Sequence, residues 1–277
     1  MTQLLFILLI LGVTQGIAEF LPISSSGHLV ILEHVPYIKK SLDTFAKNQN
    51  LFINVALHFA TLIAIIIYLW KDIIEIIKGL FLGIKEKDLT KKEVKISMYI
   101  VFASIPAGII GILLHDFFER VFSTPKIAFS LLIFNGIILI HTKKISIKDR
   151  NIEQIGLARS IFIGFFQAIA ILPGISRSGM TIAGGMFSGL APLEAARFSF
   201  LMAIPVIGGA GLLEFVKVLK GNVSTNLIVP LAITMVITIV VALACLKLLF
   251  ALVKRIKIDI FGYYTIALGI IGLIILL

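Results

Sequence analysis

The sequence contains few charged residues for its length. Of 277 residues, 14% are Asp, Glu, Lys or Arg, whereas a typical soluble domain carries about 25%. Apolar residues make up 59% of the chain, and the mean hydropathy is +1.08. A soluble fold of this size cannot bury so much apolar surface, so we expect the surrounding solvent to be lipid. This composition excludes a cytosolic enzyme, a disordered protein and a nucleic-acid-binding protein.

Cysteine is almost absent from the chain. The single residue, Cys245, lies within an apolar run, so we expect neither an intrachain disulfide nor a thiolate metal cluster. This excludes a disulfide-stabilised secreted scaffold. The apolar stretch 4–13 near the N-terminus has no basic region before it, and we therefore predict no cleaved signal peptide.

Long apolar runs are abundant, and they predict an all-α, polytopic membrane protein. A helix of about 20 residues spans the hydrocarbon core of a bilayer. Six runs meet this length approximately and predict full crossings: 52–70, 98–114, 126–141, 198–216, 227–250 and 260–277. Two further stretches, 4–32 and 160–188, are interrupted by proline, glycine and serine. Irregular backbone at membrane depth must be buried in protein or line a cavity, so these two stretches are predicted to be re-entrant helical hairpins.

The distribution of basic residues predicts the orientation. Lys and Arg outnumber Asp and Glu by 25 to 15, and many of them lie in the segments 71–97, 142–159 and 251–259. Placing these segments on the cytoplasmic side, as the positive-inside rule requires, leaves both termini outside. The longest of them, 71–97, is expected to be a solvated loop.

The two interrupted stretches are similar to each other. Displacing the chain by 152 residues aligns QGIAEFLPISSSGHL (15–29) with QAIAILPGISRSGMT (167–181), and seven of fifteen positions are identical. We therefore predict one membrane domain, 1–277, with repeat halves of about 1–145 and 146–277. Each half contains an odd number of crossings, which inverts the second half, so the two hairpins would enter from opposite sides. In inverted-repeat transporters such breaks meet near the midplane and form the site.

Three ionisable residues lie in the interrupted stretches: Glu19, His28 and Arg177. A charge at membrane depth costs from about 3 to more than 10 kcal/mol, which favours a functional role. Arg177 offers a planar donor fork that suits a phosphate. Glu19, with Gln15 four residues earlier, offers oxygen ligands for Mg²⁺ or Ca²⁺. Ser25 and His28 are candidates for a nucleophile and its base, or for a donor and a general acid.

Hydroxyl groups surround both breaks and are candidate substrate-binding groups: Ser24, Ser26, Ser176, Ser178 and Thr181. Hydroxyls, together with the amides that follow a helix break, can bind an anion. For the serines the favoured interpretation is hydrogen bonding to the broken backbone, with phosphate binding only in part. For Thr181, helix back-bonding and substrate contact are equally favoured. The other histidines are expected to pack or to lie at the membrane interface: His34, His58, His115 and His141.

These motifs resemble those of the undecaprenyl-diphosphate phosphatase family, the bacitracin-resistance membrane phosphatases. The E/Q-x-x-x-E signature of that family matches Gln15 to Glu19, and its P-G-x-S-R-S-x-x-T signature matches Pro173 to Thr181. The resemblance covers essentially the full chain. It implies hydrolysis of undecaprenyl diphosphate, a polyprenyl diphosphate lipid, to the monophosphate and inorganic phosphate with a divalent cation. This reaction recycles the carrier lipid for peptidoglycan synthesis and implies a multi-pass protein of the inner (plasma) membrane.

The resemblance also implies a functional set of four residues: Glu19, Ser25, His28 and Arg177. Position 15 is Gln where some members of the family have Glu, so Gln15 would be a neutral rather than an anionic metal ligand. The residue that attacks phosphorus stays open, as does the oligomeric state.

A lipid-phosphate transporter or flippase is the alternative function, because inverted repeats with broken helices are also typical of transporters. Release of inorganic phosphate by the purified protein distinguishes the two. A purely structural membrane subunit would leave the buried Glu19 and Arg177 unexplained.

Overall fold

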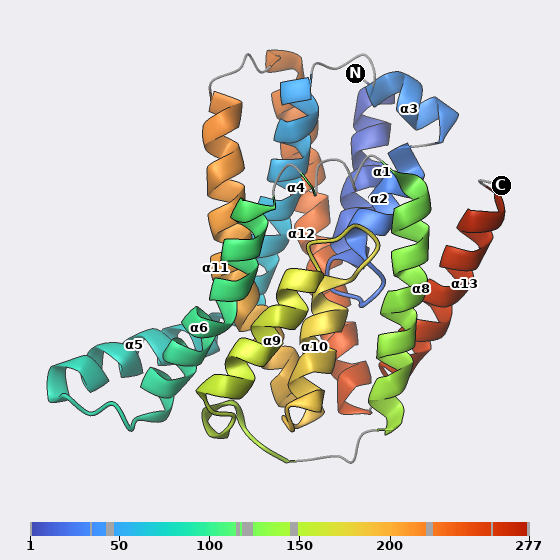
Figure 1. Cartoon of the computed structure of the whole chain (residues 1–277). Coiled ribbons are helices and arrows are strands. Elements are labelled where there is room, and N and C mark those ends of the chain that lie inside the picture. The colour runs from blue at the N-terminus through green and yellow to red at the C-terminus, as the bar shows by residue number, and fades with distance from the viewer. Residues whose placement is uncertain are drawn as a thin grey trace.

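The computed structural model describes the chain except for residues 1, 34, 43–46, 115–116, 118–123, 145–148, 220–223, 256 and 276–277. The regular elements of the described residues are helices, and most of the long ones run along one common axis (Figure 1). The protein is therefore an all-α, multi-pass membrane protein, as the apolar runs predict.

Six helices coincide with the six predicted crossings: α4 (Lys47–Tyr68), α6 (Lys92–Leu113), α8 (Pro125–His141), α11 (Pro192–Leu219), α12 (Thr225–Lys254) and α13 (Asp259–Ile275). The first five contain spans that are long and apolar enough to cross a membrane. α13 has 17 residues, about 25 Å at 1.5 Å per residue, which is at the short end of the spanning range.

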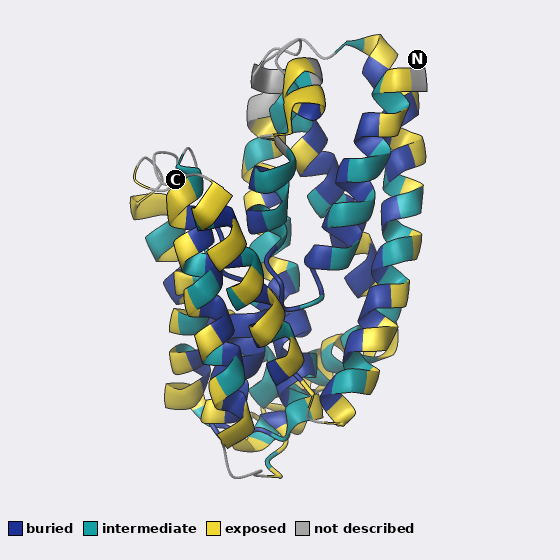
Figure 2. Cartoon of the chain, turned by 90° about the vertical axis from the view of Figure 1, so that its right-hand side faces the viewer, coloured by how far each residue is buried: buried dark blue, intermediate teal, exposed yellow. Residues whose placement is uncertain are grey.

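The outer surface of the bundle is apolar where it would contact lipid. On α12 the side chains of Val229, Val236 and Val240 lie on one face and are about three-fifths exposed. Figure 2 shows the buried residues gathered on the inward faces of the helices and exposed residues along the outside. Apolar side chains on the outside of a bundle are the pattern expected of a protein in lipid.

Two helical hairpins enter the bundle between the spanning helices. α1 (Thr2–Ala18) and α2 (Ser25–Glu33) form the first, and α9 (Leu157–Ile169) and α10 (Arg177–Phe187) form the second. In Figure 1 the first hairpin enters from the upper end and the second from the lower end, and their connecting segments meet near the middle. The re-entrant hairpins are thus present where the sequence predicts them. The division into repeat halves stays a prediction.

The breaks have a local cause. Pro22 and Pro173 lack the amide hydrogen that an α-helix needs, so both hairpins turn there. Gly174 follows with φ +92°, a conformation that favours glycine. A Cβ at this position would collide with the carbonyl oxygen of Ala128 on α8. The second break therefore depends on glycine both for its turn and for its contact with α8.

One element differs from the sequence prediction. The segment 71–97 was expected to be a solvated loop, and that expectation is wrong: α5 (Trp70–Glu86) is a helix, and α6 begins at Lys92. In Figure 1 α5 projects sideways from the lower part of the bundle. Its charged residues lie on one side and its isoleucines on the other, and this periodicity makes an amphipathic helix.

The ends of the helices agree with the predicted orientation. α1 begins and α13 ends toward one end of the bundle, whereas α5 and the ends of α8 and α12 lie toward the other (Figure 1). The basic segment 142–159 contains two short 3₁₀ turns, η1 (Thr142–Lys144) and η2 (Ile152–Gln154). The described elements also include the short helix α3 (Pro36–Leu42). The described parts of the three basic segments thus lie at the same end, as the positive-inside rule requires.

Candidate active site

The two breaks are held against each other by Asn135 on α8. Its Nδ2 donates to the carbonyl oxygen of Pro22 at 3.3 Å, and its Oδ1 accepts from the amide of Ser176 at 3.0 Å. The amide of Gly174 also donates to Ser26 Oγ at 3.3 Å. Asn135 is fully buried. An uncharged polar side chain in an apolar run gives only a weak signal, so the sequence did not indicate Asn135 as a site residue.

The four candidate serines form the same pattern in both hairpins: Ser24 with Ser26, and Ser176 with Ser178. In each pair the first hydroxyl accepts a hydrogen bond from the amide three residues later, at 3.1 Å. The two hydroxyls of each pair lie 3.1–3.2 Å apart. The first serine of each pair therefore caps the following helix, in line with the favoured interpretation, and phosphate binding by these serines stays a prediction.

Thr181 lies one turn into α10 and makes local hydrogen bonds. Its Oγ1 donates to the carbonyl oxygen of Arg177 at 2.7 Å and also lies within hydrogen-bonding distance of the Ser199 hydroxyl. The side chain is fully buried. Helix back-bonding thus occupies this hydroxyl, and substrate contact by Thr181 stays a prediction.

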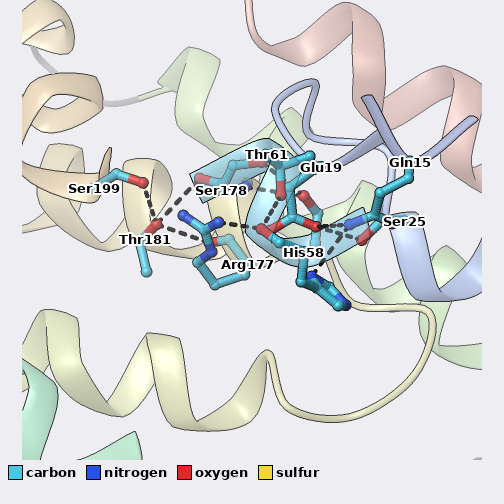
Figure 3. A network of polar contacts seen from close by, with 11 residues as sticks. Gln15, Glu19, Ser25, His58, Thr61, Arg177, Ser178, Thr181 and Ser199 are labelled. Atoms are coloured by element: carbon cyan, nitrogen blue, oxygen red, sulfur yellow. Dashed lines mark hydrogen bonds and ion pairs between the residues drawn. The ribbon is translucent and has the colours of Figure 1, made fainter. Parts of the chain in front are cut away.

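An ion pair between the two hairpins forms the centre of the site. Arg177 Nη2 donates to Glu19 Oε1 at 2.7 Å, and the side chains of Glu19 and Arg177 are only 7% and 14% exposed. Figure 3 shows them pointing toward each other. The guanidinium carbon lies 6.0 Å from the ring centroid of Phe200. Removing one partner of such a buried pair typically costs about 3–5 kcal/mol, so each residue depends strongly on the other.

The second carboxylate oxygen of Glu19 accepts two more hydrogen bonds. Ser25 Oγ donates to Oε2 at 2.8 Å, and Gln15 Nε2 donates to the same oxygen at 3.1 Å. Both donors come from the same hairpin as Glu19, on either side of the break. The carboxylate is therefore held by donors in a geometry that suits its ionised form.

His58 on α4 also belongs to the site. Its Nδ1 lies 3.2 Å from Gln15 Nε2, and because the amide nitrogen only donates, Nδ1 is the acceptor. The expectation that His58 merely packs in its span is incomplete, because the residue contacts the polar network (Figure 3). A histidine inside an apolar span was the available signal, but nothing in the sequence related it to Gln15.

His28 is held by groups other than Ser25. Its Nδ1 lies 2.8 Å from the carbonyl oxygen of Ser24, which can only accept, so Nδ1 carries the hydrogen. Its Nε2 then accepts from the hydroxyl of Tyr264 on α13 at 2.8 Å, and the two rings stack at 8°. Among the described residues, no hydrogen bond joins Ser25 to His28. Tyr264 gave no signal in the sequence, because it is one of two adjacent tyrosines in an apolar helix and nothing distinguishes it from Tyr263.

The other histidines lie away from this network or outside the described residues. His141 is at the end of α8, where its Nδ1 donates to the carbonyl oxygen of Ile137 at 2.9 Å, as expected of an interfacial residue. His34 and His115 are outside the described residues.

Two buried polar atoms at the centre of the site have no hydrogen-bond partner among the described residues: Gln15 Oε1 and Arg177 Nη1. Leaving such a group unsatisfied typically costs about 1–3 kcal/mol, so a ligand that pairs with it is stabilised. Arg177 Nη1 is a donor and suits a phosphate oxygen, whereas Gln15 Oε1 is an acceptor and suits a cation or a hydroxyl. The two atoms are therefore candidate contacts for a phosphate oxygen and for a cation or a hydroxyl, respectively.

A cation at this site would have few ligands from the protein. In the part of the chain that the structure describes, no three His, Cys, Asp or Glu side chains are grouped as a metal site. Glu19 and the unpaired Gln15 Oε1 are oxygen donors of the kind that Mg²⁺ and Ca²⁺ prefer. Mg²⁺ is often held by one or two carboxylates together with substrate phosphates. The residues present therefore fit a cation that is shared with the substrate.

Comparison with known proteins shows the family. The family model described as "Bacitracin resistance protein BacA" matches residues 8–271. Relatives named undecaprenyl-diphosphatase include one from Thermosipho africanus, 38% identical over 95% of this chain and 97% of the relative, and one from Methanosphaera stadtmanae, 36% identical over 96% of each. A third, from Rubrobacter xylanophilus, is 34% identical over 94% of each chain. The matched range includes both breaks and the polar network between them, and the chain belongs to the bacitracin resistance protein BacA family.

Proposed function

We propose that this protein is an integral-membrane phosphatase that hydrolyses undecaprenyl diphosphate to undecaprenyl phosphate and inorganic phosphate. Relatives named undecaprenyl-diphosphatase match nearly the full chain at 34–38% identity, and nothing in their names favours the transporter alternative. The observation that carries the proposal is the buried Arg177–Glu19 pair, with the Ser25 hydroxyl 2.8 Å from the same carboxylate. The protein would act in the plasma membrane and recycle the carrier lipid for cell-wall synthesis.

Arg177 binds the diphosphate in this proposal. Its Nη2 is held by Glu19, so the planar guanidinium has a fixed orientation, and its Nη1 is free to donate to a phosphate oxygen. α10 begins at Arg177, and the N-terminus of a helix carries a partial positive charge that attracts anions. Both features would supply positive charge that stabilises the diphosphate oxygens in the transition state.

Ser25 is the attacking group in this proposal, and Glu19 is its base. The Ser25 hydroxyl already donates to Glu19 Oε2, so the proton can pass to the carboxylate as Oγ bonds to the terminal phosphorus. The bond from that phosphorus to the bridging oxygen breaks, and undecaprenyl phosphate leaves. Water then cleaves the phosphoserine and releases inorganic phosphate. His28, whose Nε2 contacts Tyr264 rather than Ser25, is assigned to proton exchange in the hydrolytic step.

A divalent cation, when bound, would neutralise charge on the diphosphate. Glu19 and Gln15 are the residues that would hold it, as the unpaired Gln15 Oε1 supports.

Replacing Ser25 by alanine tests the proposed nucleophile. In detergent-solubilised protein we expect Ser25→Ala to lower phosphate release by about 100-fold or more, because both the attacking oxygen and its activation are lost. Acid-quenched wild-type protein should also carry a phosphate on Ser25 in intact-mass spectra. Ser104→Ala on α6 is the matched control, since that hydroxyl only donates to the Ile100 carbonyl oxygen within its own helix.

Full turnover by Ser25→Ala would remove Ser25 as the nucleophile while leaving the phosphatase proposal intact. A wild-type protein that releases no phosphate would contradict the phosphatase itself and favour the transporter.

Replacing Tyr264 by phenylalanine tests the support of His28. The variant keeps the ring stacked on His28 but removes the hydroxyl that donates to Nε2. A neutral hydrogen bond contributes about 0.5–1.5 kcal/mol, so we expect kcat to fall by about 2–12-fold with little change in KM. Tyr263→Phe is the control, because the neighbouring Tyr263 is 55% exposed. Equal turnover by the two variants would show that Tyr264 does not position His28.

A further inference from the structure

α5 lies outside the site and carries an exposed apolar stripe. The stripe consists of Trp70, Ile74, Ile77, Phe81 and Ile84, which recur at spacings of four and three and so share one helix face. These side chains are 40–71% exposed. An apolar face of this length on a helix that projects from the bundle needs an apolar environment.

The opposite face of α5 packs against α6. Gly79 and Gly83 lie there, and a Cβ at either position would collide with Glu93 or Val94 of α6. This close contact sets the rotation of α5 about its own axis and turns the apolar stripe away from α6. With 17 residues, of which six are charged, α5 is too short and too polar to span a bilayer. It is instead an amphipathic helix of the kind that lies in a membrane surface.

The acidic residues of α5 are paired within the protein. Each has a basic partner on α6, on α11 or next to α6: Asp72 with Arg197, Glu75 with Lys92 at 2.7 Å, and Glu86 with Lys91 at 2.6 Å. Among the described residues, the three lysines of the helix form no ion pair. The charge that α5 presents outward is therefore positive.

These three lysines flank the apolar stripe on one side. Lys71, Lys78 and Lys85 are seven residues apart, and each directly follows a residue of the stripe. They therefore form a second stripe about 100° around the helix. The Nζ of Lys71 lies 5.8 Å from the centroid of the Trp70 ring. Lysines beside an apolar face can extend their ammonium groups to lipid phosphates while their stems stay in the apolar region.

We propose that α5 anchors the protein in the cytoplasmic membrane surface and binds anionic phospholipid headgroups through Lys71, Lys78 and Lys85. The apolar stripe enters the acyl region, and the lysine stripe lies at the level of the phosphates. The cytoplasmic side follows from the position of α5 at the end of the bundle that carries the basic segments (Figure 1). This contact is separate from the active site and does not depend on the proposed phosphatase activity.

Trp70 is the only tryptophan of the chain, so its fluorescence reports on the start of α5 alone. The full chain is reconstituted in phosphatidylcholine vesicles that contain brominated phosphatidylglycerol or brominated phosphatidylcholine at equal mole fraction. We expect both lipids to quench Trp70, because the stripe lies in the acyl region. At low salt the phosphatidylglycerol should quench about twofold more strongly, and the excess should fall at high salt, where headgroup charges are screened.

In the variant Lys71→Gln/Lys78→Gln/Lys85→Gln, brominated phosphatidylglycerol should no longer quench Trp70 more strongly than brominated phosphatidylcholine does. The quenching by phosphatidylcholine itself should remain. Losing the ammonium of Lys71 near Trp70 changes the emission equally in both lipids. The ratio of the quenching by phosphatidylglycerol to the quenching by phosphatidylcholine is therefore unaffected by this change. Lys39→Gln/Lys40→Gln on α3, at the opposite end of the bundle, is the control and should keep the excess. Equal quenching of the wild type by both lipids would overturn the binding of anionic headgroups. Quenching by neither lipid would place Trp70 in water and overturn the anchor, and an excess retained by the triple variant would overturn the assignment to these lysines.

Discussion

Replacing Arg177 by lysine is expected to lower kcat for phosphate release by about 10²–10³-fold. The guanidinium holds Glu19 through Nη2 and keeps Nη1 free for the substrate. A lysine ammonium keeps the charge but not the planar fork, so it cannot serve both partners in fixed geometry. A factor of this size corresponds to about 2.7–4 kcal/mol of lost transition-state stabilisation.

The measurement is phosphate release from undecaprenyl diphosphate by the purified variant at saturating substrate. Arg159→Lys is the matched control, because Arg159 is exposed on α9, the helix that leads into the same break. The variant keeps the buried positive charge, so its thermal unfolding should stay close to that of the wild type. Turnover within about threefold of the wild-type value would remove Arg177 from the mechanism.

Replacing Glu19 by glutamine is expected to have the largest effect, a loss of activity of about 10³-fold or more. The amide cannot take the proton of Ser25, and it leaves the buried guanidinium of Arg177 without a counter-charge. Breaking a buried pair in this way costs about 3–5 kcal/mol, so the unfolding temperature in detergent should also fall. The residual activity should need a higher concentration of divalent cation, because an anionic ligand has been replaced by a neutral one.

Titrating phosphate release with Mg²⁺ or Ca²⁺ in wild type and Glu19→Gln separates these effects. Glu75→Gln is the control, because Glu75 lies on α5, outside the active site. Its side chain is exposed and pairs with Lys92. An unchanged cation titration curve in Glu19→Gln would contradict Glu19 as a cation ligand. Near-normal turnover at saturating cation would contradict its role as the base.

The contacts of Ser25 illustrate how far local spacing predicts a site. Ser25 and His28 are three residues apart in the sequence, and they were candidates for a nucleophile and its base, or for a donor and a general acid. α2 begins at Ser25 itself, so the hydroxyl lies at the break and reaches Glu19, while His28 contacts Tyr264 on α13. The path of the chain through the break determines the partner of Ser25, and residue spacing does not describe that path.

Hydropathy and the two breaks at Pro22 and Pro173 were sufficient to predict the all-α membrane fold, five long apolar spans and the hairpins, because these features depend on contiguous residues and the thickness of a bilayer. The charged residues Glu19 and Arg177 were recognisable for the same reason, since a charge in an apolar stretch is conspicuous. The contributions of Asn135, His58 and Tyr264 depended on the packing of α8, α4 and α13 around the hairpins. Each of these polar residues is unremarkable within its own helix, and only the packing of helices distant in the chain brings it to the site.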